Sequence, residues 1–140
     1  MPHLRRASFA GDDEVSIRAI RTTVFCEEQG VDPAIDFDGN DASAIHVLVS
    51  CIGEPVATGR VLQDGHIGRI AVLRKHRKTG VGEKVVLALV EAARQAGCTR
   101  VFLGSQLHAT GFYARLGFSP YGNEYVEAGI GHIHMELTLE

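Results

Sequence analysis

The sequence predicts an α+β (mixed α/β) fold built on a largely antiparallel sheet, and three observations support this. Three strand-like runs, at 44–52, 54–63 and 66–73, follow one another with tight turns between them, as in an antiparallel meander. An amphipathic helix then leads to a short apolar run at 99–105, which indicates one strand–loop–helix–strand crossover. At 140 residues, the chain is expected to form a single domain, 1–140.

The N-terminal part is expected to form a strand at 3–10 and a helix over 11–30. Asp12 or Asp13 can cap the first free N–H groups of this helix, and Gly30 offers a stop. Four apolar residues at roughly helical spacing are expected on its buried face: Val15, Ile20, Val24 and Phe25. The segment 31–43 is expected to be a turn-rich acidic loop.

The C-terminal part is expected to contain two helices and two strands. The first helix follows Gly80 and ends before Gly97, with an apolar face made by Val81, Val85, Leu89, Ala92 and Ala96. After the strand at 99–105 come a short helix at 109–117 and a closing strand at 131–139. No repeat or linker interrupts the order.

Composition excludes several classes of protein. No run approaches the ~20 apolar residues of a membrane span, and the first residues lack the apolar core of a secretory signal. Three widely spaced cysteines argue against a disulfide framework or a zinc site, so a cytoplasmic protein without a metal is expected. A net charge of −3 argues against a general nucleic-acid binder.

Charge is unevenly distributed along the chain. Five of the fourteen Lys and Arg residues fall between Arg69 and Lys78. Between Arg21 and Arg60 there are none, while seven carboxylates accumulate there: Glu27, Glu28, Asp32, Asp36, Asp38, Asp41 and Glu54. The first region suits an anion and the second a cation.

The basic stretch RKHRKTGVGEKVV, at 74–86, has the features of an anion site. A strand that runs through a Gly-containing turn into a helix aims unpaired N–H groups and the positive helix end at one spot. Gly80 and Gly82 allow close approach of the backbone to a phosphate. The P-loop and dinucleotide motifs do not match, and the alternative is a tight turn with a solvated basic rim.

Several stretches together resemble the GNAT superfamily of acyl-CoA-dependent N-acetyltransferases, in its small ElaA-like branch. R-K-T-G-V-G at 77–82 matches the [Q/R]-x-x-G-x-[G/A] pyrophosphate loop, and GRIAVLRKHRKTGVGEKVV, VFLGSQLHATGFYARLGF and EYVEAGIGHIHMEL occur in the expected order. VFCEEQGV, with DFDGNDASAIHVL, is similar to the N-terminal half of the ElaA-like branch. The resemblance covers nearly the whole chain. It implies a twisted, mostly antiparallel sheet splayed into a V and flanked by helices, with acyl-CoA between two diverging strands.

The resemblance also assigns roles to individual residues. Tyr113 matches the Tyr that often protonates the leaving thiolate, and Gly104 stands where many relatives carry an Asn that holds the pantetheine arm. The residues expected to bind acetyl-CoA are Ile70, Ala71, Val72, Arg77, Lys78, Thr79, Gly80, Val81, Gly82, Gln106 and Phe112. Tyr113 has a second interpretation, because it could instead pack a hydrophobic seam with Phe112 and Phe118.

The reaction needs a base, because an amine with a pKa near ~10 is protonated at neutral pH. Glu28 is the preferred candidate, with Glu27, His46 and His132 as alternatives. His132 and His134 share a face of a strand, but no third metal ligand lies at a telling spacing.

The leading hypothesis is therefore transfer of acetyl from acetyl-CoA to a primary amine of a small molecule or protein. The alternative is a non-catalytic acyl-CoA-binding regulatory module. The acidic segment predicts a cationic acceptor. The resemblance implies that the chain could form a homodimer, as relatives of this size often do.

Overall fold

A four-stranded antiparallel sheet forms the N-terminal half of the protein, whose computed structural model describes residues 2–139. Its strands lie in the order β1-β2-β3-β4, with bounds Pro2–Ala7, Ile45–Cys51, Glu54–Val61 and Ile67–Val72. Gly53 and Gly65, in the turns after β2 and β3, have φ of 77° and 94°, which glycine adopts at little cost. The expected meander is confirmed.

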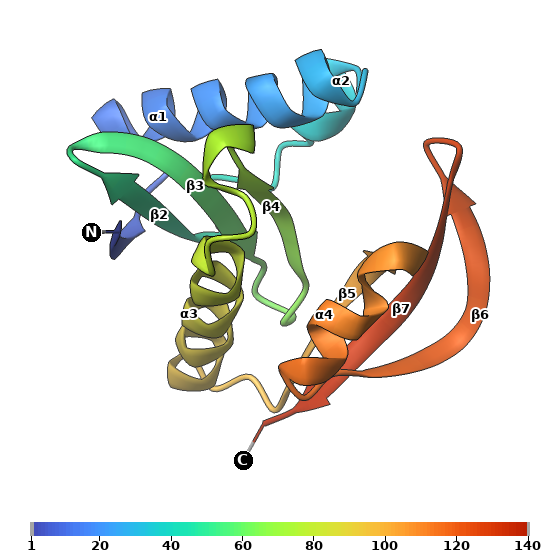
Figure 1. Ribbon diagram of the computed structural model, residues 1–140. Coiled ribbons are helices and arrows are strands. Elements are labelled where there is room, and N and C mark those ends of the chain that lie inside the picture. The colour runs from blue at the N-terminus through green and yellow to red at the C-terminus, as the bar shows by residue number, and fades with distance from the viewer. Residues whose placement is uncertain (1, 140) are drawn as a thin grey trace.

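A second, three-stranded antiparallel sheet forms the other half. It has the order β5-β7-β6, with bounds Arg100–Gln106, Ile130–Thr138 and Ser119–Glu127. A single parallel bridge, between His66 and Phe102, joins the two sheets at the base of β4 and β5. Beyond this bridge the two strands diverge, so the sheets form the two arms of a V (Figure 1). The fold class and the splayed sheet are confirmed.

Helices cover both faces of the first sheet (Figure 1). On one face, α1 (Gly11–Arg21) continues directly into the π-helical segment η1 (Thr22–Glu28), which the short helix α2 (Pro33–Asp36) follows. On the other face lies α3 (Val81–Gln95), which packs on β2, β3 and β4. The helix α4 (Thr110–Arg115) packs beside β5 and β6. Two single turns, η2 (Arg74–His76) and η3 (Leu107–Ala109), precede α3 and α4.

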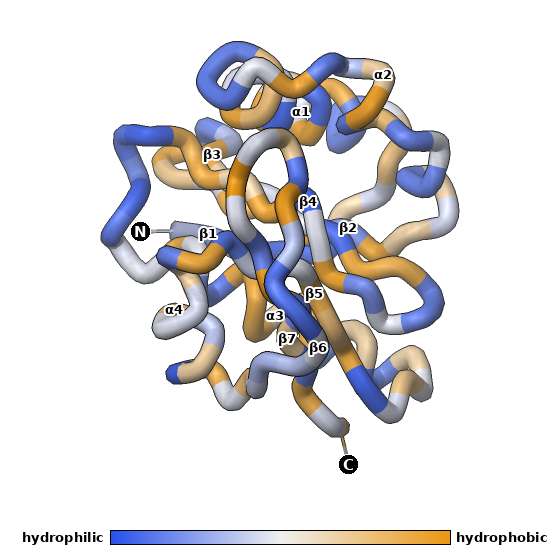
Figure 2. The backbone as a smooth tube through the Cα atoms, turned by 90° about the vertical axis from the view of Figure 1, so that its right-hand side faces the viewer, coloured by the Kyte–Doolittle hydropathy of each residue, from blue (hydrophilic) through white to orange (hydrophobic). Residues whose placement is uncertain are grey.

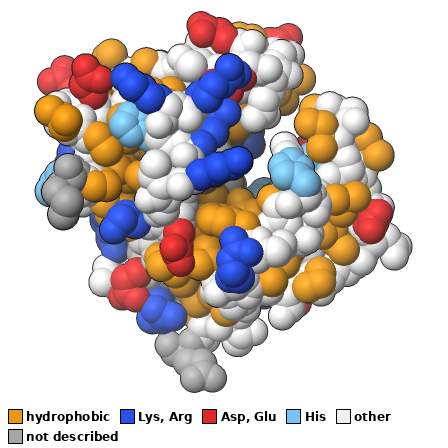
Figure 3. Space-filling view, in the orientation of Figure 1, with side chains coloured by type: hydrophobic (Ala, Val, Ile, Leu, Met, Phe, Trp, Pro, Cys, Tyr) orange, Lys and Arg blue, Asp and Glu red, His pale blue; other side chains and the backbone are white. Residues whose placement is uncertain are grey.

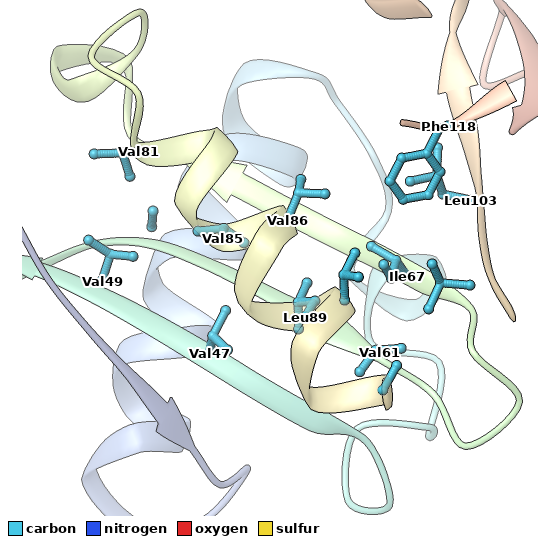
Figure 4. Packing of buried hydrophobic residues seen from close by; sticks show 14 of the residues in the cluster. Val47, Val49, Val61, Ile67, Val81, Val85, Val86, Leu89, Leu103 and Phe118 are labelled. Atoms are coloured by element: carbon cyan, nitrogen blue, oxygen red, sulfur yellow. The ribbon is translucent and has the colours of Figure 1, made fainter. Parts of the chain in front are cut away.

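The main core lies between α3 and the two sheets. Figure 4 shows Val81, Val85, Val86 and Leu89 of α3 directed towards Val47, Val49, Val61 and Ile67 of the first sheet. Leu103 and Phe118 extend the same core into the second arm. The helix packs closely on β3, because a Cβ at Gly59 would lie 2.7 Å from Cγ1 of Val85. Because helices cover both faces of the first sheet, β2 and β3 contain runs of consecutive buried residues, and Figure 2 shows hydrophobic residues along the strands.

The structure corrects the expected buried face and cap of the first helix. Val15 is 68% exposed and Ile17 is fully buried, because a residue two positions from Ile17 lies on the far side of the helix. Neither Asp12 nor Asp13 caps the helix. The N-cap residue is Ala10, which makes no side-chain cap bond, and Asp13 instead forms an ion pair of 2.6 Å with Arg5. The stop at Gly30 agrees with its φ of 72°.

Two further elements differ from the expectations. Ala96, expected on the buried face of α3, is exposed at its C-cap. The strand β6 was missed, because Pro120 and Gly122 interrupt it and most of its residues are exposed. Such features are typical of edge strands, which carry little hydrophobic signal.

Candidate functional site

The loop at 77–80 and the first turn of α3 form the anion-binding part of the site. Gly80 is the N-cap residue of α3, with a φ of 86° that brings the basic loop onto the helix end. The first internal bond of α3 runs from the N–H of Lys84 to the carbonyl of Gly80. The N–H groups of Val81, Gly82 and Glu83 therefore precede the helix ladder and point outward from its positive end. This geometry suits a phosphate group.

Gly82 faces the space between the two arms. A Cβ built on it would lie 3.8 Å from both Cζ of Phe112 and Cγ2 of Val72, which is ordinary van der Waals contact. The fold itself therefore has room for a side chain at this position. Figure 3 shows basic side chains on one side of a hollow between the arms, and hydrophobic side chains within it.

The strand β4 presents an unpaired backbone edge to this hollow. Its register with β3 shifts between Thr58 and Arg60, and Arg69 lies opposite this shift with a φ of 51°. Such a bulge bends a strand. Within residues 2–139, the His66–Phe102 bridge is the sole pairing on the outer edge of β4. Ile70, Ala71 and Val72 are thus placed where an extended ligand could pair with them.

The guanidinium group of Arg77 is hydrogen-bonded to partners outside the N-terminus of α3. Its Nε donates to the carbonyl oxygen of Val72 at 2.9 Å, and its Nη2 donates to Oε1 of Glu28 at 2.6 Å. Thr79 also bonds within the loop, from its hydroxyl to the carbonyl of His76. Lys78, in contrast, is exposed and has a φ of 62°.

Tyr113 lies in α4 between two aromatic rings. Its ring makes edge contacts with Phe112 and Phe118, with centroid distances of 5.0 and 5.9 Å. Burial raises the pKa of its hydroxyl. That hydroxyl makes no hydrogen bond within residues 2–139. The packing interpretation is thus observed, while the role of acid stays a prediction.

Gln106, the last residue of β5, pairs in register with His132 of β7. Gly104 has a structural explanation, because a Cβ there would lie 2.2 Å from the hydroxyl of Tyr125. The Tyr125 ring stacks on both His132 and His134, with centroid distances of 5.5 and 4.6 Å. His132 is further held by a 2.7 Å contact between its Nδ1 and the carbonyl of Ile130.

The acidic segment is largely neutralised by arginines that the sequence analysis did not connect to it. Arg21 pairs with Asp36 and Asp41, and Arg60 pairs with Asp38 and Asp41, at 2.7 to 3.2 Å. Four of the seven carboxylates form ion pairs with arginines: Glu28, Asp36, Asp38 and Asp41. Within residues 2–139, Glu27, Asp32 and Glu54 form no ion pair, so the cationic acceptor stays a prediction that depends on fewer free charges than the sequence contains.

The arginines of this buried network lower the pKa values of Asp38 and Asp41. Burial raises the pKa of Asp41, but bonds from Arg21 and Arg60 outweigh it, so the net pKa is below its usual range. The hydrogen bonds from Arg60 lower the pKa of Asp38. Burial lowers the pKa of His46, whose Nε2 lies 2.9 Å from the carbonyl oxygen of Asp41. His46 therefore has a structural role.

The sequence of α1 contains one signal for this buried ion-pair network. Arg21 follows Ile17 and Ile20 at spacings of four and one and precedes Val24 by three, so it occupies the buried stripe of the helix. A charged residue in such a stripe needs a buried partner. The pattern predicts that partners exist, but not which carboxylates they are.

Other classes of site are not indicated in the described part of the chain. Between residues 2 and 139, no three His, Cys, Asp or Glu side chains are arranged to hold a metal ion. No helix in this range combines the length and apolarity that crossing a membrane requires.

An anion-binding helix end beside an open strand edge, in a V-shaped sheet, can hold an extended ligand that carries phosphate groups. The model of the acetyltransferase (GNAT) domain matches residues 22–139, and the chain therefore belongs to the GNAT family of acetyltransferases. It is an acyltransferase enzyme. This finding argues against the alternative of a non-catalytic module.

The chain is also similar to individual proteins and solved structures, of which YyaT is named as an uncharacterized protein. The protein YyaT of Bacillus subtilis is 39% identical over 126 residues, which cover 86% of this chain and 85% of YyaT. An acyl-CoA N-acyltransferase from Pseudomonas aeruginosa is 26% identical, with a TM-score of 0.88 over 99% of this chain and 100% of its own. ElaA of Escherichia coli is 29% identical, with a TM-score of 0.87 over 98% of this chain and 99% of its own.

Proposed function

We propose that this protein transfers an acetyl group from acetyl-CoA to a primary amine by direct attack of the amine on the thioester. The observation that carries the proposal is the juxtaposition of the α3 N-terminus, the open edge of β4 and α4: a Cβ at Gly82 would lie 3.8 Å from both Val72 of β4 and Phe112 of α4. The name of the Pseudomonas aeruginosa neighbour, an acyl-CoA N-acyltransferase, supports acyl-CoA as the donor.

The parts of the cofactor have separate binding regions in this proposal. The N–H groups of Val81 and Gly82, with the exposed Lys78, bind the pyrophosphate. The pantetheine arm lies along β4 and bonds to the backbone of Ile70, Ala71 and Val72. A backbone N–H in this stretch polarises the thioester carbonyl and stabilises the oxyanion that develops there. Phe112 and Gln106 border the arm on the side of the second sheet.

The reaction involves several proton transfers. Glu28 takes one proton from the ammonium group of the acceptor, and the free amine attacks the carbonyl carbon. As the C–N bond forms and the C–S bond breaks, Tyr113 gives its proton to the sulfur. A second amine proton, lost as the amide forms, returns to Tyr113 through water, and Glu28 releases its proton to the solvent. The products are an N-acetylated amine, CoA and one proton.

A screen of amines with release of the CoA thiol as the readout tests this function. Alkylamines, polyamines, amino acids and a peptide with a free N-terminus form a sufficient first set. We expect at least one class to release CoA at a rate well above hydrolysis of acetyl-CoA alone. Absence of amine-dependent release in protein that binds acetyl-CoA would contradict the proposal. The same screen determines the charge of the acceptor.

A further inference from the structure

Arg77 is the first residue of the cofactor loop, yet its guanidinium group is engaged away from the helix N-terminus. Nε donates to the carbonyl oxygen of Val72 at 2.9 Å and Nη2 donates to Oε1 of Glu28 at 2.6 Å. The second bond joins two opposite charges, and charge-assisted hydrogen bonds of this length are the strong ones. The Glu28 side chain is 20% exposed and the Arg77 side chain 38%, so the pair lies at the surface with its carboxylate side partly covered.

These two bonds join three segments that are far apart in the sequence. Arg77 belongs to the cofactor loop, Val72 ends β4, and Glu28 ends η1. Arg77 therefore connects the cofactor-binding face of the first sheet to the end of the helix on its other face. A planar guanidinium can hold two acceptors in fixed directions, whereas an ammonium group acts as a point charge.

The pairing also leaves one oxygen of Glu28 available. Arg77 engages Oε1, and Arg74 lies 3.9 Å from the same atom. Within residues 2–139, Oε2 of Glu28 accepts no hydrogen bond. A base held through one oxygen, with the other free, is oriented for proton transfer in the way that a third group orients a catalytic base.

Other cations near the start of α3 are not engaged in ion pairs within the described part of the chain. Lys75, Lys78 and Lys84 flank the helix N-terminus, are exposed, and form no ion pair within residues 2–139. If Arg77 turned to the phosphates, Glu28 would lose its 2.6 Å charge-assisted hydrogen bond and keep only the more distant Arg74. The use of a lysine without an ion pair breaks no such bond.

We propose that Arg77 is a positioning residue, which fixes the Glu28 carboxylate and the end of β4, and that its side chain is not a ligand of the cofactor phosphates. The positioning role rests on the proposed function, because it takes Glu28 as the base. The statement that the Arg77 side chain does not bind the phosphates, the binding half of the proposal, does not depend on that function. The backbone of Arg77 remains part of the loop. This assignment differs from the role that the loop motif implies.

Calorimetric titration with acetyl-CoA tests the binding half. Arg77→Gln should leave the Kd within about twofold of the unaltered protein, because no phosphate contact is lost. Lys78→Gln, the matched control, removes one cation from the same loop and should raise the Kd about tenfold. Thermal unfolding verifies that both variants are folded. An Arg77→Gln effect on Kd equal to that of Lys78→Gln, in folded protein, would overturn the proposal.

Steady-state kinetics with the best amine of the screen test the positioning half. Arg77→Gln and Arg77→Lys should both lower kcat, since lysine keeps the charge but cannot hold two acceptors. Glu28→Gln should also lower kcat, and Arg77→Gln should add little to it, because the two residues act as one unit. Additive effects, or full activity of Arg77→Lys, would refute the positioning role. If no amine reacts, the proposed function fails while the titration still decides the binding half.

Discussion

Replacement of Tyr113 by Phe separates the chemistry of the hydroxyl from the packing of the ring. The ring makes edge contacts with Phe112 and Phe118, and both contacts survive in the variant. The hydroxyl makes no hydrogen bond within residues 2–139, so its removal leaves no buried partner unsatisfied. We expect the free energy of unfolding to change by less than about 0.5 kcal/mol.

The expected effect on the reaction is larger. Without an acid the sulfur leaves as a thiolate, and general acids typically contribute 10²- to 10⁴-fold. A thiolate is a fair leaving group, so we expect kcat to fall by about tenfold or more, equivalent to at least ~1.4 kcal/mol of activation free energy. The raised pKa of Tyr113, above the ordinary value near 10, keeps the hydroxyl protonated in any assay near neutral pH.

The assay combines three measurements on Tyr113→Phe and the unaltered protein. Release of the CoA thiol gives kcat, calorimetry gives the Kd for acetyl-CoA, and thermal unfolding gives the stability. A lower kcat with the other two unchanged assigns the hydroxyl to the chemical step. An unchanged kcat would refute the acid role and leave Tyr113 as a packing residue. A large loss of stability would instead refute the packing argument above.

Three further predictions concern the cofactor loop and the buried ion pairs. Gly82→Asp should fold normally, because a Cβ has room, but should weaken acetyl-CoA binding at least tenfold by placing bulk and negative charge at the helix end; unchanged affinity would exclude a phosphate there. Arg21→Leu leaves Asp36 and Asp41 with one arginine each. We expect it to lower the free energy of unfolding by about 3 kcal/mol and the Tm by roughly 10 °C. A change in Tm below ~2 °C would show that the network contributes little to stability. Stability should fall as pH drops below about 4, because Asp38 and Asp41 have lowered pKa values and the unfolded chain takes up protons first; urea unfolding that is constant from pH 6 to 3 would contradict this.

Local patterns in the sequence were sufficient for most elements. Short strand-like runs separated by Gly-containing turns predict β2, β3 and β4, and a 3.6-residue period predicts α3, because turn chemistry and helical period follow directly from backbone geometry. The basic loop with Gly80 and Gly82 likewise predicts an anion site at the start of α3. Where the local signal is weak, as in the exposed edge strand β6, the prediction failed.

Contacts between distant segments required the tertiary structure. The number of charges in the acidic segment can be read from the sequence. Only the fold shows that Arg21, Arg60 and Arg69 pair with its aspartates. The loop motif contains Arg77, but only the fold directs its guanidinium to Glu28, 49 residues away. The physical reason is the range of the interactions: secondary structure depends on neighbours in the chain, whereas an ion pair depends on which segments the core brings together.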